Sequence, residues 1–89
     1  MYLFVEFKIK DHSGLIKEWG KITDHLPKGC RLFHHFFVKD HSHLFCLIEY
    51  ENLNNLRNFL RDHFGMYTTM MSWEVDERHA EGLMLKRSA

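Results

Sequence analysis

The first strand is visible as an alternation of apolar and polar positions. Between Tyr2 and Lys10 every second residue is apolar, which is the period of a half-buried β-strand. The residues on this apolar side are Leu3, Val5, Phe7 and Ile9. The other side mixes aromatic and charged residues, so the pattern does not predict a purely solvated surface there.

A helical period follows this strand. Apolar residues recur every three or four positions, which is the stripe of an amphipathic helix. They are Leu15, Trp19, Ile22 and Leu26. Ser13 is the predicted N-cap, and Pro27-Lys28-Gly29 is expected to end the helix.

The segment from Cys30 to Tyr50 has the pattern of a β-hairpin. Two runs rich in aromatic and aliphatic residues, 31–39 and 44–50, flank the polar residues 40–43. A short polar break between two strand-like runs predicts a tight connection. Closure near Ser42 leaves two registers open, one with His34 and the other with His35 opposite Glu49.

A second helix and a fourth strand complete the pattern. Asn52 is the predicted N-cap of a helix that Gly65 ends. Its apolar side carries Leu53, Leu56, Phe59, Leu60 and Phe64. Residues 66–76 read as a strand, and the polar tail 77–89, with its apolar patch at 83–85, is expected to form a short helix or to cross onto a partner subunit.

The order of these elements predicts the fold class. A βαββαβ chain with right-handed crossovers forms a four-stranded antiparallel sheet with both helices on one face. We therefore predict one α+β domain of the ferredoxin-like type over residues 1–76, with strands one and three in the middle of the sheet.

One face of such a sheet has no helices over it. We expect the face with Leu3, Val5, Phe7 and Ile9 to lie under the helices, together with Met71, Trp73 and Val75. The open face is then expected to carry Tyr2, Phe4, Glu6, Phe45, Leu47, Glu49, Thr68, Met70 and Ser72. This set has too many aromatic residues for a face left in water, so we predict a homodimer formed through the open face.

Charge and cysteine content narrow the classes of function. The chain has 12 lysine and arginine residues and 12 aspartate and glutamate residues. It therefore has no excess of positive charge of the kind that attracts nucleic acid or an anionic membrane. Cys30 and Cys46 lie far apart along the predicted hairpin, which favours reduced thiols in a cytoplasmic protein. The N-terminus has no signal-peptide pattern, and no apolar run reaches transmembrane length.

The predicted hairpin brings candidate chemistry to the open face. In either register a histidine, His34 or His35, lies opposite Glu49, on the surface that also holds Glu6. A histidine beside a carboxylate is a workable general acid/base pair. The alternative is that such a pair is an ordinary cross-strand stabiliser.

The remaining histidines predict no metal centre. His41 and His43 lie two apart in the predicted turn, with His12 in another loop, but zinc needs three or four converging ligands. We expect solvated loop histidines, no bound metal and no cofactor. The sequence also has no glycine-rich phosphate loop and no nucleophile elbow.

Three segments carry a resemblance to a known superfamily. They are Phe45-Cys46-Leu47-Ile48-Glu49, the helix over 52–64, and Ser72-Trp73-Glu74-Val75-Asp76-Glu77. Over roughly residues 30 to 85 the chain resembles small uncharacterised bacterial proteins of the dimeric α+β barrel superfamily. The resemblance implies two subunits that pack their sheets into one barrel, with a small-molecule pocket inside the barrel or between sheet and helices. Characterised members include cofactor-free monooxygenases, lactone isomerases and haem-using enzymes.

This resemblance leads to a functional hypothesis. The protein would bind, and by acid/base chemistry transform, a small apolar or aromatic molecule, with Phe4, Phe45, Leu47 and Trp73 as ligand contacts. A non-catalytic structural or ligand-binding dimer remains the alternative.

A second resemblance is to RNA-recognition modules, which share the βαββαβ order. Phe45, Ile48 and Tyr50 match part of their third-strand signature, and Phe4 would be a stacking platform on the first strand. However, Leu44 stands in place of the signature glycine and Leu47 in place of a stacking aromatic. We therefore do not expect nucleic acid to be the partner.

Overall fold

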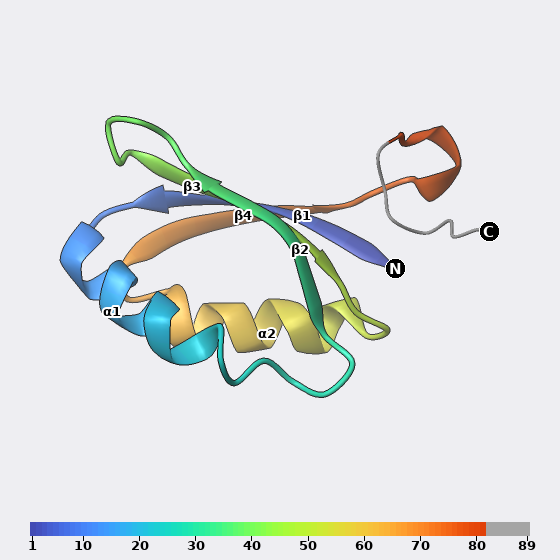
Figure 1. The fold of residues 1–89 in the computed structure, drawn as a ribbon, viewed down its shortest axis with the longest axis horizontal. Helices are drawn as coiled ribbons and strands as arrows, with labels where there is room; N and C mark the ends of the chain where they lie inside the picture. Colours follow the sequence, from blue (N-terminus) through green and yellow to red (C-terminus); the bar gives the residue numbers. More distant parts are fainter. Residues whose placement is uncertain (82–89) are drawn as a thin grey trace.

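The computed structural model describes residues 1–81 of the chain. Its elements follow the predicted βαββαβ order (Figure 1). They are β1 (Tyr2–Ile9), α1 (His12–Ile22), β2 (Arg31–Phe37), β3 (His43–Glu49), α2 (Leu53–Phe64), β4 (Thr68–Glu74) and the short 3₁₀ helix η1 (Glu77–His79).

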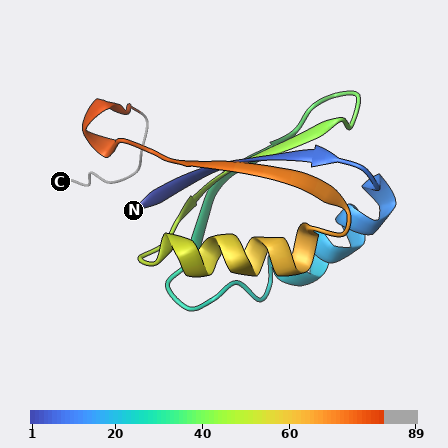
Figure 2. The same ribbon diagram turned by 180° about the vertical axis from the view of Figure 1, so that it is seen from behind.

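The strands form a single antiparallel sheet in the order β2-β3-β1-β4. Both α-helices lie on the same side of this sheet, and neither covers the other side (Figures 1 and 2). The predicted ferredoxin-like α+β fold is therefore confirmed, including the central position of β1 and β3.

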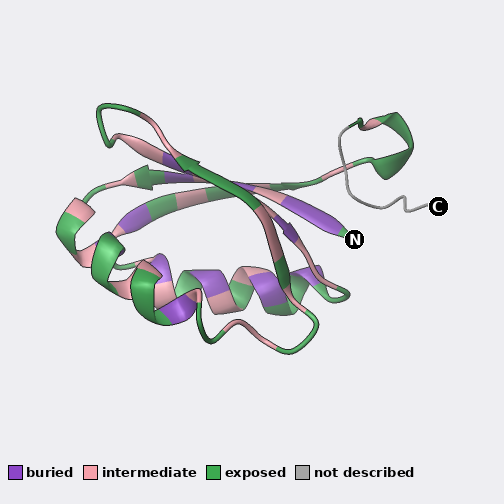
Figure 3. Ribbon diagram, viewed as in Figure 1, coloured by how far each residue is buried: buried purple, intermediate pink, exposed green. Residues whose placement is uncertain are grey.

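The hydrophobic core fills the space between the sheet and the two helices (Figure 3). β1 and β3 contribute alternate residues to it, as their period predicts, and α2 contributes four residues from one side. The buried members are Leu3, Val5, Phe7, Leu15, Ile22, Leu44, Cys46, Ile48, Leu53, Leu56, Leu60 and Phe64. Burial of a large apolar side chain contributes about 1.5–3 kcal/mol each, so these residues are the main favourable term in folding.

The observed ends of the two helices agree with the prediction for α2 but differ from it for α1. Asn52 caps α2 as predicted, with its side-chain oxygen accepting from the Asn55 amide at 3.0 Å. The cap of α1 is Asp11 rather than Ser13, because the extended Asp11 backbone lets its carboxylate accept from the Gly14 amide at 3.0 Å. α1 ends at Ile22, before the residues expected to stop it.

The register of the β2–β3 hairpin differs from both predicted registers. Arg31 lies opposite Glu49, and His34 lies opposite Leu47. The prediction that His34 or His35 faces Glu49 was therefore wrong.

The turn explains this shift in register. The Val38 amide donates to the His43 carbonyl at 2.9 Å and closes the turn. The centre of the turn therefore lies between these two residues, before Ser42. The His41 backbone has a positive φ of 62°, and the Asp40 carboxylate accepts from the Ser42 amide at 3.0 Å. An aspartate that bonds to the amide two residues on is a turn-forming interaction, and here it moves the turn toward the N-terminus.

A β-bulge in β2 adds a second change. Leu32 lies opposite Ile48 and His34 lies opposite Leu47, so Phe33 is an extra residue between two consecutive pairs. A bulge of this kind changes which residues of the strand face which side of the sheet. Alternation along β2 alone therefore cannot place its side chains.

The two faces of β4 are the reverse of the expectation. Met71 and Trp73 lie opposite Glu6 and Phe4 on the open face, whereas Met70 packs against the core. The expected arrangement, with Met71, Trp73 and Val75 under the helices and Thr68, Met70 and Ser72 on the open face, was wrong. Val75 lies beyond the end of the strand.

The start of β4 sets this orientation. The buried Thr68 hydroxyl donates to the Phe64 carbonyl at 2.8 Å, and the Tyr67 amide donates to the same carbonyl at 3.0 Å. These bonds join the strand tightly to the end of α2 and turn the Thr68 side chain inward. Both sides of β4 carry apolar residues, so alternation alone could not reveal this.

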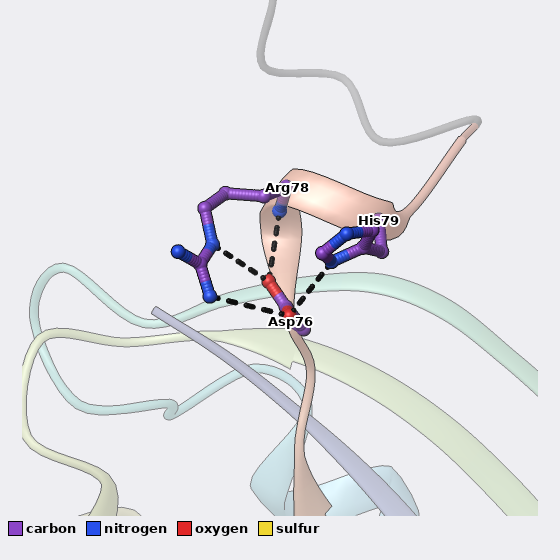
Figure 4. Close-up of polar contacts among 3 residues, drawn as sticks. All are labelled: Asp76, Arg78 and His79. Carbon is purple, nitrogen blue, oxygen red and sulfur yellow. Dashed lines mark hydrogen bonds and ion pairs between the residues drawn. The ribbon is translucent and has the colours of Figure 1, made fainter.

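The described part of the tail is a compact polar turn (Figure 4). The Asp76 carboxylate accepts from the Arg78 amide at 3.1 Å and lies 2.9 Å from His79 Nδ1. Hydrogen bonds from His79 and then from Arg78 lower the pKa of Asp76. The tail 77–89 was expected to form a short helix or to cross onto a partner; residues 77–79 form η1, and the rest of the tail from residue 82, with its apolar patch at 83–85, lies outside the described residues.

No helix within residues 1–81 is long and apolar enough to cross a membrane.

The core predicts a large stability difference between two neighbouring positions on α2. Leu56 is fully buried and Asn55 is exposed. Leu56→Ala is expected to lower the free energy of unfolding by about 2–5 kcal/mol, because it leaves a cavity. Asn55→Ala, the matched control, is expected to change it by less than about 0.5 kcal/mol. Urea unfolding followed by circular dichroism measures both, and equal effects would contradict this description of the core.

Candidate functional site

A row of aromatic side chains crosses the open face of the sheet. Phe36, Phe45, Phe4 and Trp73 come from β2, β3, β1 and β4 in that order. Their neighbouring ring centroids are 5.4, 5.8 and 6.1 Å apart, within the range of favourable ring contacts. The open face therefore presents a continuous apolar strip made by all four strands.

Both ends of this strip are accessible in the single chain. Phe36 at one end is 57% exposed, and Trp73 at the other end is 46% exposed. Met71, beside Trp73 on the same face, is 56% exposed. Large apolar side chains grouped in this way are typical of an interaction or ligand surface.

A histidine and a glutamate meet at this strip. His43 Nε2 lies 3.4 Å from Glu6 Oε2, and His43 Nδ1 lies 2.8 Å from Ser42 Oγ. The His43 ring also packs against Phe45, with ring centroids 5.9 Å apart. These contacts orient the imidazole, and they connect a hydroxyl, an imidazole and a carboxylate beside an apolar surface.

The elements of the fold explain this contact. His43 is the first residue of β3, and its backbone lies opposite Lys8. Glu6, two residues before Lys8, points to the same face, so the two side chains meet diagonally across the β1–β3 pair. A histidine–glutamate pair therefore exists on the open face, but its members are His43 and Glu6.

The residues of the predicted pair have other partners. Glu49 forms an ion pair with Arg31, whose Nη1 lies 3.5 Å from Glu49 Oε1. His34 is an exposed residue opposite Leu47. His35 lies on the helix side, where its ring is 5.1 Å from that of Trp19.

The other candidate histidines do not converge on a metal. The rings of His12 and His41 stack almost in parallel, with centroids 4.2 Å apart, and they join the start of α1 to the hairpin turn. His43 points instead to Glu6. Among residues 1–81 no group of three or more histidine, cysteine, aspartate or glutamate side chains could hold a metal ion.

The two cysteines are free and lie on the core side. Burial raises the pKa of Cys30 to about 11 and that of Cys46 to about 12. A thiol acts as a nucleophile in its ionised form, so neither cysteine is prepared for nucleophilic chemistry at neutral pH.

A separate hollow lies at the end of β4, lined by Glu74, Val75, Asp76, Glu77 and Arg78. All of these residues belong to one short segment, so the fold does not bring distant chemical groups together there. The aromatic strip, in contrast, takes its residues from all four strands.

The sequence placed part of this strip correctly. Phe4, Phe45, Leu47 and Glu6 lie on the open face as expected, and Trp73, which was expected under the helices, lies there with them. Two residues at the strip were not expected there: the pattern placed His43 in the turn, and it gave Phe36 no functional role. The signal that could have revealed His43 is the register of β1 with β3, in which Glu6 and His43 lie on one face and two residues apart.

The cysteines lead to a prediction about reactivity. At pH 8 both native thiols are expected to react slowly with 5,5′-dithiobis(2-nitrobenzoic acid), and quickly after unfolding in guanidinium chloride, because burial keeps them protonated. Cys30→Ala assigns the remaining signal to Cys46. Rapid labelling of both thiols in the native protein would contradict their burial.

The same pKa values give a direction for stability against pH. A raised pKa means that the folded state holds the proton more tightly than the unfolded state, in which a thiol titrates near about 8.5. This contribution to stability is complete below that pH and is lost as the pH rises through 11 and 12. The loss is expected to be smaller in a variant with both cysteines replaced by alanine.

A scan against protein-family models, a search of curated proteins and a search of solved structures each returned no match. The βαββαβ ferredoxin-like topology is accordingly a property established by this structure.

Proposed function

We propose that the protein is a homodimer that binds a small apolar or aromatic molecule between the open faces of its two sheets. The observation that supports this best is the aromatic strip with the Glu6–His43 pair beside it. The resemblance to dimeric α+β barrels implies the same arrangement, in which two sheets enclose one interior.

A second copy of the chain fits the chemistry of this face. Both of its carboxylates lie close to a basic side chain, with Arg31 beside Glu49 and His43 beside Glu6. Two such faces would not repel each other strongly, and each offers exposed rings for the other to cover. A surface that is its own complement is what a two-fold interface requires.

The Glu6–His43 pair is the group that we propose for proton exchange with the bound molecule. An imidazole can accept or release a proton near neutral pH, and a carboxylate beside it can accept one in a general-base step. Packing on Phe45 and the Ser42 contact would hold the imidazole in place while it does so. A dimer that binds its ligand without transforming it would use the same pair as a polar anchor.

The dimer is tested by a charged substitution on the open face. Sedimentation equilibrium is expected to give about twice the chain mass of 10.8 kDa for the unmodified protein. Met71→Arg is expected to weaken association at least about tenfold, because it buries an arginine without a partner. Ile16→Arg is the matched control, since Ile16 is 43% exposed on α1, away from the sheet.

The sedimentation result can also contradict the proposed dimer interface. A fully monomeric unmodified protein at all concentrations, or equal effects of the two variants, would rule out the open face as the dimer interface. Circular dichroism of each variant shows whether the fold is retained.

A second candidate function is binding of single-stranded RNA, which the close Phe4–Phe45 pair favours. Two central rings on an open sheet are the platform on which RNA-recognition modules stack bases. However, Glu6 and Glu49 lie on the same face, and the chain has formal net charge +0. Counterion release from phosphates therefore gives little driving force.

RNA binding can be tested directly. Fluorescence anisotropy with a labelled single strand of about eight nucleotides is expected to show no binding at physiological salt, because the face has no net positive charge. Binding that weakens on adding salt, and that Phe45→Ala abolishes, would replace the small-molecule proposal with an RNA-binding one.

A further inference from the structure

Glu6 is a carboxylate beside the aromatic strip. Its backbone lies opposite Phe45 on β3 and opposite Met71 on β4. Phe4 lies two residues before it on the same side of β1, and the rings of Phe4 and Phe45 are 5.8 Å apart. The side chain of Glu6 is 28% exposed, so its carboxylate lies next to an apolar surface and is accessible to a ligand from solvent.

The charge of Glu6 is balanced less firmly than that of Glu49. Glu49 has a permanent cation beside it, the guanidinium of Arg31 at 3.5 Å. The neighbour of Glu6 is the imidazole of His43, which is charged only when protonated. Lys8 lies next along the same side of β1, but it is exposed and forms no ion pair within residues 1–81.

A carboxylate beside aromatic rings has a specific chemical preference. Ring faces attract cations, and more strongly when water is excluded. A carboxylate adds a direct charge interaction and accepts the N–H groups of an ammonium. An anionic ligand would instead be repelled by Glu6, and a neutral ring would use the aromatic strip without using the carboxylate.

We propose that the open face binds an organic ammonium with an apolar or aromatic body. Glu6 is the counter-ion of the ammonium, Phe4 and Phe45 supply ring faces beside it, and the apolar body extends along the strip toward Trp73. This inference rests on the proposed function, which places the ligand on the open face, and it adds the chemical class of that ligand.

The test compares a cationic probe with neutral and anionic probes of nearly the same shape. Isothermal titration calorimetry at pH 8, where histidine side chains are ordinarily neutral, measures 2-phenylethylammonium, 2-phenylethanol and 3-phenylpropionate. The ammonium is expected to bind at least about tenfold more tightly than the alcohol. The carboxylate probe is expected to bind more weakly than the alcohol.

Two carboxylate variants separate a specific role of Glu6 from a general effect of negative charge. Glu6→Gln is expected to reduce the preference for ammonium over alcohol to about twofold or less, while binding of the alcohol is retained. Glu49→Gln removes the same charge from the same face and is expected to leave the preference unchanged, because Arg31 already neutralises Glu49.

The outcomes distinguish this inference from the proposed function. Equal binding of the ammonium and the alcohol by the unmodified protein, or an unchanged preference in Glu6→Gln, overturns the ammonium assignment and leaves an aromatic-binding face. Binding of none of the probes also overturns the ammonium assignment, and a monomeric protein in sedimentation would overturn the proposed function with it.

Discussion

The antiparallel pairing of β1 with β3 is the constraint on which both faces of this protein depend, because paired residues must point to the same side of the sheet. With Val5 opposite Cys46, the apolar residues of the two central strands meet under the helices. The same register places Phe4 opposite Leu47 on the other side. A shift by one residue would exchange core and open face along a whole strand, so the core and the candidate site are fixed by one set of hydrogen bonds.

The open face follows from how the helices are distributed. Both α-helices cover the core side (Figures 1 and 2). The four strands all contribute aromatic residues to the side without helices. A small domain buries a smaller fraction of its surface than a large one, so rings left in water are a larger loss of stability for it. A face of this composition therefore supports a role in association or in ligand binding rather than in solvation alone.

The charges on this face are arranged around two carboxylates with different neighbours. Arg31 balances Glu49 with a permanent charge, whereas His43 balances Glu6 only when its ring is protonated. The two pairs have similar lengths but different chemistry. A carboxylate whose neighbour is a neutral imidazole can still pair with a cationic ligand or exchange a proton. The functional proposals concentrate on Glu6 for this reason.

The sequence by itself determined the order of the elements, the fold class and most of the core. Those features depend on local periods and caps, such as the alternation along β1 and the Asn52 cap of α2. It also identified Phe4, Phe45 and Glu6 as residues of the open face, because β1 and β3 alternate clearly between apolar and mixed positions.

Only the tertiary structure decided which side chains meet on that face. The hairpin turn at Asp40 and His41 and the bulge at Phe33 moved His34 and His35 away from Glu49. The hydrogen bond from the Thr68 hydroxyl to the Phe64 carbonyl directs Thr68 toward the core, and this orientation reverses the expected faces of β4. Which side chains meet across two strands changes when the register shifts by a single residue. Hydrogen bonds in the turn and contacts with α2 set that register, and the alternation of residues within one strand does not reveal them.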